Sequence, residues 1–98
     1  MANNTRDRVQ FAALPCRISE GSQRQVLLLT SRETRRWVIP KGWPMKGLKP
    51  RAVAVREAYE EAGLLGTITS KHMIGVYHYE KQLPREQRLC EVRVSSFG

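Results

Sequence analysis

The chain has little cysteine, no long hydrophobic run and no apolar leader. Its two cysteines, Cys16 and Cys90, are too few for a disulfide scaffold, and neither lies in a CxxC or a cysteine–histidine cluster. We therefore expect two free thiols, buried or partly buried, in a reducing cytosol. No segment approaches the roughly 20 apolar residues that cross a bilayer, and residues 1–8 are polar, unlike a secretory signal. These absences predict a cytoplasmic protein without a membrane partner.

Negative charge is also scarce, and the positive charge is concentrated. Lys and Arg number 17 against 9 Asp and Glu, a net charge of +8. Residues 32–56 hold eight basic residues and one acid, and residues 57–61 then hold three glutamates. Such carboxylates would repel the phosphates of duplex DNA, so we expect no DNA partner. The arrangement suits acids that hold a divalent cation beside bases that hold a polyanion; the alternative is a solvated charged surface.

The order of the expected elements is strands, one helix and further strands, which defines an α+β fold. With 98 residues, 41% hydrophobic, the chain is long enough for one globular domain spanning residues 1–98. The apolar run at 25–30 predicts a strand buried on both faces. Trp37 is expected in the core, the alternative being a ring that stacks on a base. The expected elements are strands at 9–18, 25–30 and 37–39, a loop at 40–50, a helix at 51–62, extended chain at 67–81 divided into two strands at Gly75, and a strand at 88–94.

The helix has clear start and stop signals. Pro50 suits the first turn, where its missing N–H costs nothing, and Gly63 suits the left-handed residue that ends a helix. Between them, apolar residues recur at spacings of three and four, which predicts a stripe that packs on the sheet. The members of this stripe are Ala52, Val55, Tyr59 and Ala62.

A different face of this helix carries Glu57, Glu60 and Glu61. Like charges four residues apart cost a few tenths of a kcal/mol in an isolated helix, and a bound cation would relieve that repulsion. Carboxylates suit Mg²⁺ or Mn²⁺ rather than zinc. Arg56 is placed either to pair with Glu60 or to orient Glu57. The alternative is an exposed helix that is simply rich in acids.

The residues around this helix also match a known pattern. Residues 56–64 read Arg-Glu-Ala-Tyr-Glu-Glu-Ala-Gly-Leu, and Gly42 precedes them at the required offset. This arrangement resembles the signature of the Nudix hydrolases, with six of its seven fixed letters present. Trp37 to Gly42 resembles the strand and loop that precede the signature in that family. The resemblance extends over about residues 8–94.

The resemblance implies a fold, a reaction and a set of residues. The fold is an α/β/α sandwich with a mixed β-sheet. The reaction is metal-dependent attack of water on a pyrophosphate bond in a nucleoside diphosphate linked to another group. The metal, Mg²⁺ or Mn²⁺, would be held by the Gly42 carbonyl and by three glutamates. Arg56 would hold the first glutamate by a salt bridge. The implied catalytic positions are Arg56, Glu57 and Glu60, the metal ligands Gly42, Glu57, Glu60 and Glu61, and the substrate contacts Lys41, Trp43 and Arg36.

Two departures from the family pattern change the expectations. Leu48 stands where the family has its first glutamate, so we expect weaker binding of further cations. The sequence stops before the family's usual closing strand and C-terminal helix, which would leave apolar surface bare and favour a homodimer or strand exchange. That missing part sometimes supplies the general base, so the role is unassigned. We expect Glu80, Glu86 and Glu91 to be ordinary surface acids.

The substrate is expected to be a phosphorylated small molecule. The run from Val55 to Gly66 looks most like the branch that cleaves diphosphoinositol polyphosphates and diadenosine polyphosphates. Nucleotide sugars, ADP-ribose and capped RNA ends stay open. The alternative to an enzyme is a catalytically weakened Nudix-like domain that binds a phosphorylated ligand or RNA.

Overall fold

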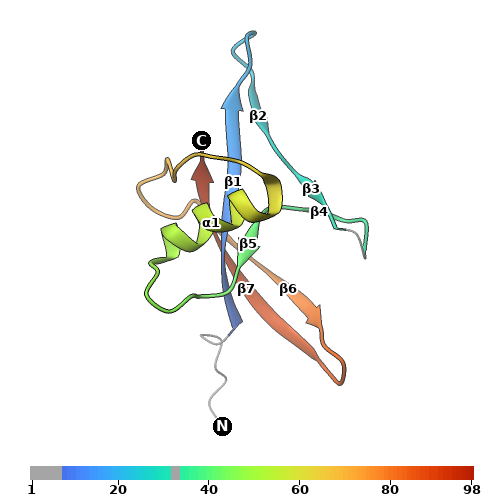
Figure 1. Cartoon of the computed structure of the whole chain (residues 1–98). Coiled ribbons are helices and arrows are strands. Elements are labelled where there is room, and N and C mark those ends of the chain that lie inside the picture. Colours follow the sequence, from blue (N-terminus) through green and yellow to red (C-terminus); the bar gives the residue numbers. More distant parts are fainter. Residues whose placement is uncertain (1–7, 32–33) are drawn as a thin grey trace.

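The computed structural model describes residues 8–31 and 34–98. Its elements are arranged around one helix that crosses a curved sheet (Figure 1). In chain order they are β1 (Val9–Ile18), β2 (Arg24–Val26), β3 (Leu29–Thr30), β4 (Trp37–Val38), β5 (Lys41–Gly42), α1 (Pro50–Ala62), β6 (Gly75–Gln82) and β7 (Gln87–Phe97).

The main sheet is mixed, as predicted. Its strands follow the order β2-β1-β7-β6, and β5 pairs with β1 beside β2. The central pair, β1 and β7, is parallel from Val9 opposite Glu91 to Pro15 opposite Phe97, whereas the other pairs are antiparallel. A separate two-stranded sheet joins β3 and β4. The hairpin of β6 and β7 extends well past the helix in Figure 1, so α1 covers only one part of the sheet.

Side-chain alternation along β1 and β7 divides the core between two faces of the sheet. On the helix side, Ala13 and Phe97 pack with Ala54 and Ala58 of α1. On the opposite side, a second buried cluster forms around the small and branched residues of the same strands. Its members are Ala12, Ile39, Val92 and Val94, with Leu14 and Tyr79 packed against them.

The predicted helix is confirmed, but its predicted buried stripe is wrong. Pro50 lies in the first turn, and Gly63 ends the helix at φ 67°, with its N–H donating to the Tyr59 carbonyl at 2.8 Å. Tyr59 is 58% exposed. Small residues let the helix approach the sheet closely, so a neighbouring face packs inward and the tyrosine points outward. The buried residues are Val53, Ala54, Glu57 and Ala58.

Four other predictions are also corrected. The run at 25–30 is divided between β2 and β3 and is exposed or half-buried, because these short strands lie at the sheet edge and in the small sheet. Trp37 is 72% exposed rather than in the core. The chain at 67–81 forms one strand that begins at Gly75, preceded by an isolated bridge between Ile68 and Phe97. The expected loop at 40–50 contains β5, since its first residues pair with β1.

The two cysteines are free thiols, as expected from the sequence. Cys16 is half-buried, Cys90 is buried, and both are free thiols. The Cys16 thiol donates to the Leu14 carbonyl at 3.2 Å. In residues 8–31 and 34–98, no helix combines the length and the apolar character needed to cross a membrane.

Candidate active site

The candidate site begins where α1 meets β5. Gly42 is buried, and a Cβ atom built on it would lie 2.6 Å from both Cγ and Cδ of Glu57. Real Cβ atoms essentially never lie so close to another atom, so the glycine leaves the space that the Glu57 side chain occupies. The Glu57 side chain is itself buried, which is unusual for a carboxylate.

Glu61 lies one helical turn beyond Glu57 and faces the same strand. Its Oε1 accepts a hydrogen bond from the backbone N–H of Lys41 at 3.2 Å. Burial, with smaller effects from a hydrogen bond with Glu61 and from repulsion by that carboxylate, raises the pKa of Glu57 to about 7. The two carboxylates therefore lie close enough to compete for a proton or to share a cation.

A cleft of about 400 Å³ opens beside these carboxylates. Acidic, basic and aromatic side chains meet in it, which is the composition expected of a site for a charged ligand. The cleft is lined by Gln10, Lys41, Gly42, Trp43, Pro44, Met45, Glu57, Glu61, Tyr79 and Lys81.

The two lysines of the cleft each lie over an aromatic ring. The Lys41 Nζ is 5.5 Å from the centre of the Tyr79 ring, and the Lys81 Nζ is 6.0 Å from the centre of the Trp43 ring. Burial lowers the pKa of the Lys41 ammonium, while the nearby Glu61 opposes that shift. The Tyr79 hydroxyl donates to Oε1 of the buried Gln10 at 2.6 Å, which fixes the ring under Lys41.

The remaining predicted residues lie elsewhere. The Arg56 Nε is 3.5 Å from Oε1 of Glu60, and both side chains are largely exposed, so this i,i+4 pair contributes little to stability. Neither residue lines the cleft. Of the two partners considered for Arg56, the structure pairs it with Glu60. Arg36 lines a neighbouring groove. The catalytic and ligand roles of these residues stay predictions.

The donors in the cleft fit a divalent cation of the magnesium type. Within the part of the chain that the structure describes, no three histidine, cysteine, aspartate or glutamate side chains gather closely enough to hold a metal ion. Mg²⁺, however, is usually held by one or two carboxylates together with substrate phosphates and water. Glu57, Glu61 and the backbone of Gly42 provide such a set of oxygen donors.

Leu48, which replaces a signature glutamate, also lies away from the cleft. Its N–H donates to the Met45 carbonyl at 3.0 Å within the loop that leads to α1. Its side chain contributes to a separate groove with Arg51, Ala52 and Val55. The loop conformation therefore directs this position toward the N-terminal half of the helix.

Sequence reasoning missed Gln10, Tyr79 and Lys81 as residues of the cleft. Tyr79 and Lys81 alternate along β6 and share one face of the strand, and Gln10 is a polar residue within an otherwise apolar strand. These signals mark one face of each strand. They do not show which other segment lies beside that face, because this depends on the register of β1, β7 and β6.

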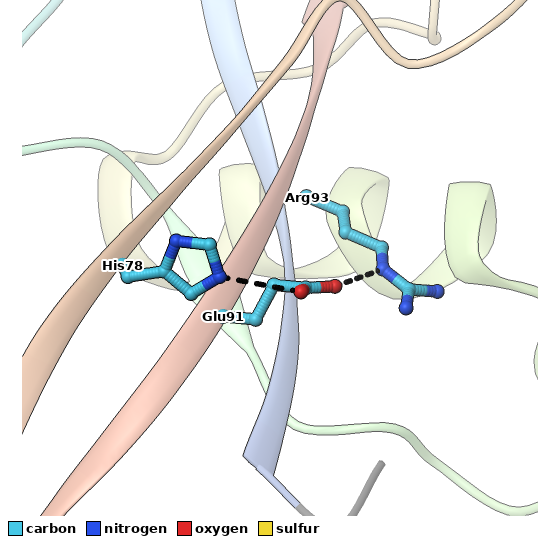
Figure 2. A network of polar contacts seen from close by, with 3 residues as sticks. All are labelled: His78, Glu91 and Arg93. Carbon is cyan, nitrogen blue, oxygen red and sulfur yellow. Dashed lines mark hydrogen bonds and ion pairs between the residues drawn. The ribbon is translucent and has the colours of Figure 1, made fainter. Parts of the chain in front are cut away.

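A second polar network lies on neighbouring strands β6 and β7 (Figure 2). One carboxylate oxygen of Glu91 is 3.3 Å from the His78 Nε2, and the other accepts from the Arg93 Nε at 2.7 Å. The hydrogen bond from Arg93 lowers the pKa of Glu91. A carboxylate held in this way is a weaker proton acceptor than a free one.

The fold and this cleft define a small α+β domain in which acidic, basic and aromatic side chains meet at one site. The family model described as the NUDIX domain matches residues 9–97, and the chain belongs to that family. The relation predicted from Gly42 and residues 56–64 is therefore confirmed.

Curated relatives carry the name of one branch of the family. The chain is 36% identical over 77 residues to diphosphoinositol polyphosphate phosphohydrolase 3-alpha of Mus musculus, a match that covers 79% of this chain and 44% of the relative. It is 34% identical over 88 residues to diphosphoinositol polyphosphate phosphohydrolase 2 of Homo sapiens, covering 85% of the chain and 48% of the relative. The chain thus spans less than half the length of these relatives.

Solved structures share the fold. The Ap4A hydrolase of C. elegans superposes with a TM-score of 0.62 at 20% identity, covering 90% of this chain and 66% of that one. A Nudix hydrolase from M. smegmatis superposes with a TM-score of 0.54 at 18% identity, covering 92% and 61%. The predicted Nudix-type fold with a mixed sheet is confirmed by these likenesses.

Proposed function

We propose that this chain is a divalent-metal-dependent hydrolase of a pyrophosphate bond. Its substrate is a nucleoside diphosphate linked to another group, or a related molecule such as a diadenosine or diphosphoinositol polyphosphate. The close contact between Glu57 and Gly42, with Glu61 beside them, carries this proposal. The names of the relatives and of the C. elegans structure support the substrate range.

The acidic and the basic residues of the cleft have different roles. Glu57, Glu61 and the Gly42 carbonyl would hold the cation, which, when bound, neutralises bridging phosphate oxygens and lowers the pKa of the attacking water. Lys41 and Lys81, which also line the cleft, would bind the anionic phosphates. In the reaction, water adds to one phosphorus, the P–O bond of the bridge breaks, and two phosphorylated products leave.

The packing of this site also provides preorganisation. The backbone N–H of Lys41 holds Glu61, and the contact with Gly42 restricts Glu57, so neither carboxylate can turn freely into solvent. Tyr79 is fixed by Gln10 and supports the Lys41 side chain. Groups that are held in place before the substrate arrives lose less conformational entropy on binding.

A second candidate function is a phosphate-binding domain with weak or no turnover. The observation that favours it is the position of Glu60, whose carboxylate pairs with Arg56 outside the cleft. Leu48 adds to this view because it supplies no carboxylate. Such a protein would bind phosphorylated ligands or RNA through the same lysines without consuming them.

A cation-dependent activity screen separates the two candidates. Product release is measured with Mg²⁺ or Mn²⁺ over diadenosine polyphosphates, diphosphoinositol polyphosphates and nucleotide sugars. We expect Glu57→Gln and Glu61→Gln to lower activity roughly 100-fold or more, since even outer-shell changes at metal sites cost 10- to 100-fold.

The matched control is Glu86→Gln, because Glu86 is an exposed acid that pairs with Arg88 and lies outside the cleft. This variant should keep full activity. If the unaltered chain releases no product from any substrate with either cation but still binds them, the binding domain is the correct description.

A further inference from the structure

Gln10 is a polar residue at a position that otherwise suits an apolar one. It lies on β1 with only 4% of its surface exposed. Its ladder partner on β7 is Val92, and the side chains on this face of the two strands, Ala12 and Val92, belong to a buried apolar cluster. An amide with two N–H donors and a carbonyl acceptor is costly to bury there unless these groups find partners. The hydrogen bonds of Gln10 therefore have to account for its presence.

The fold uses only one end of the Gln10 amide. Its Oε1 accepts a hydrogen bond from the Tyr79 hydroxyl at 2.6 Å. Burial raises the pKa of Tyr79 to about 12, so this hydroxyl keeps its proton near neutral pH and can donate. No residue that the structure describes accepts a hydrogen bond from the amide nitrogen, Nε2. Both of its N–H groups are therefore free for a ligand.

The free amide nitrogen is reached from the candidate active site. Among the described residues, the one fully enclosed side-chain nitrogen or oxygen without a partner is the Arg8 Nε, so the Gln10 Nε2 is not enclosed. Gln10 lines the cleft, and Lys41 and Lys81 belong to the same lining. A donor that is buried except toward a hollow with two lysines suits the oxygen of an anion.

We propose that the Gln10 amide donates a hydrogen bond to a non-bridging phosphate oxygen of the substrate, and that Tyr79 orients the amide for this contact. The inference rests on the proposed function and adds a binding residue that carries no charge. A neutral donor serves one phosphate oxygen without the repulsion that a third cation would bring to Lys41 and Lys81. Because Tyr79 engages the carbonyl, the nitrogen end of the amide is left for the phosphate.

Nuclear magnetic resonance of the unaltered chain tests this contact without catalysis. The probe is methylenediphosphonate with Mg²⁺, a diphosphate analogue whose P–C–P bridge water does not cleave. We expect the assigned side-chain amide protons of Gln10 to shift downfield in a saturable way and those of the exposed Gln25 to stay unchanged. Adenosine, which has no phosphate, should move neither signal. No shift of the Gln10 amide at millimolar analogue, or an equal shift with adenosine, would overturn the proposal.

Kinetics of the whole chain separate a direct contact from a structural role. Gln10→Met removes the amide without adding charge, and it should raise KM about tenfold, the size expected when a hydrogen bond to a charged group is lost, with kcat changed less. Tyr79→Phe removes only the orienting hydroxyl, so the donor remains and KM should rise less. Equal rises in the two variants would show that Gln10 acts only through Tyr79 and would refute the contact.

The matched control is Gln25→Met on β2. The Gln25 Oε1 accepts from the Arg17 Nε at 2.7 Å, so the same change removes a similar bond at a residue outside the cleft. Its KM should not change. An unchanged KM in Gln10→Met would refute the contact while leaving the hydrolase proposal intact. If the unaltered chain hydrolyses nothing, the proposed function fails, and the titration with methylenediphosphonate alone decides whether Gln10 binds a phosphate group.

Discussion

Gly42 and Glu57 lie so close together that a single added methyl group at the glycine would overlap the stem of the carboxylate. The contact joins β5 to α1, which are also linked by the hydrogen bond from the Lys41 N–H to Glu61. It also restricts the rotamer of Glu57. Stability and site geometry therefore depend on the same pair of residues.

We expect Gly42→Ala to destabilise the fold by about 1–3 kcal/mol, the usual cost of overpacking a tight contact. It should also reduce metal-dependent activity more than the loss of folded protein accounts for. Urea unfolding and activity at low temperature measure the two effects. The control is Gly75→Ala, because no atom lies within 4 Å of a Cβ built there. Equal stability of the two variants would contradict the contact.

The metal-free protein should lose stability as the pH rises between about 4.5 and 7. The Glu57 carboxyl has a folded-state pKa of about 7, raised above its ordinary 4.5 mainly by burial, so the folded chain holds a proton that the unfolded chain has released. The stabilising effect is complete below pH 4.5 and is lost as the pH passes 7. Thermal unfolding in the presence of a chelator measures the slope.

Two additions sharpen that experiment. Glu57→Gln should flatten the stability profile in this window, because the amide does not titrate. Mg²⁺ should raise the unfolding temperature of the unaltered chain above pH 7, since a ligand of the folded state stabilises by mass action. A flat profile in the unaltered metal-free chain would show that Glu57 is not buried as described.

Tyr79→Phe should cost roughly 1–3 kcal/mol of folding free energy. The change removes the hydroxyl that donates to Gln10, whose side chain is buried and would be left without that partner. Tyr77→Phe is the matched control: the same change on the same face of β6, where the described residues show no hydrogen bond to the hydroxyl. Similar free energies of unfolding for both variants would argue against a specific Tyr79–Gln10 bond.

Glu60→Gln separates a structural role from a ligand role. The pair with Arg56 is exposed, so its loss should change the free energy of unfolding by less than about 0.5 kcal/mol. If Glu60 turns into the cleft to bind a cation, as the family signature implies, activity should nevertheless fall more than about tenfold. Unchanged activity with unchanged stability would show that Glu57 and Glu61 suffice.

Local signals in the sequence were enough to predict the helix. A proline in the first turn and a glycine at the end set the bounds of α1, and the family resemblance implied that Gly42 and Glu57 share one metal site. The prediction of the buried face was wrong. Apolar residues recur at helical spacing both on the face that contains Tyr59 and on the adjoining face that contains Ala58, so spacing alone does not distinguish the two faces. Only the sheet, whose Ala13 accepts a close alanine, decides between them.

Burial of the strands was harder to predict. The run of leucines at 25–30 is compatible with a central strand and with an edge strand. Which of the two it forms depends on the tertiary structure and not on the local sequence. The same limit applies to the cleft. Gln10, Tyr79 and Lys81 come together because β1 pairs with β7 and β7 with β6, over separations of about 70 residues that no short motif encodes.

The parallel pairing of β1 with β7 has a consequence for how the molecule is made. Val9 pairs with Glu91, so the central ladder cannot close until β7 has left the ribosome. Pairings between such distant segments fold slowly, because a long loop must be ordered first. We therefore expect the segments before β7, α1 included, to stay in an incompletely folded state, exposed to chaperones and proteases, until β7 is available.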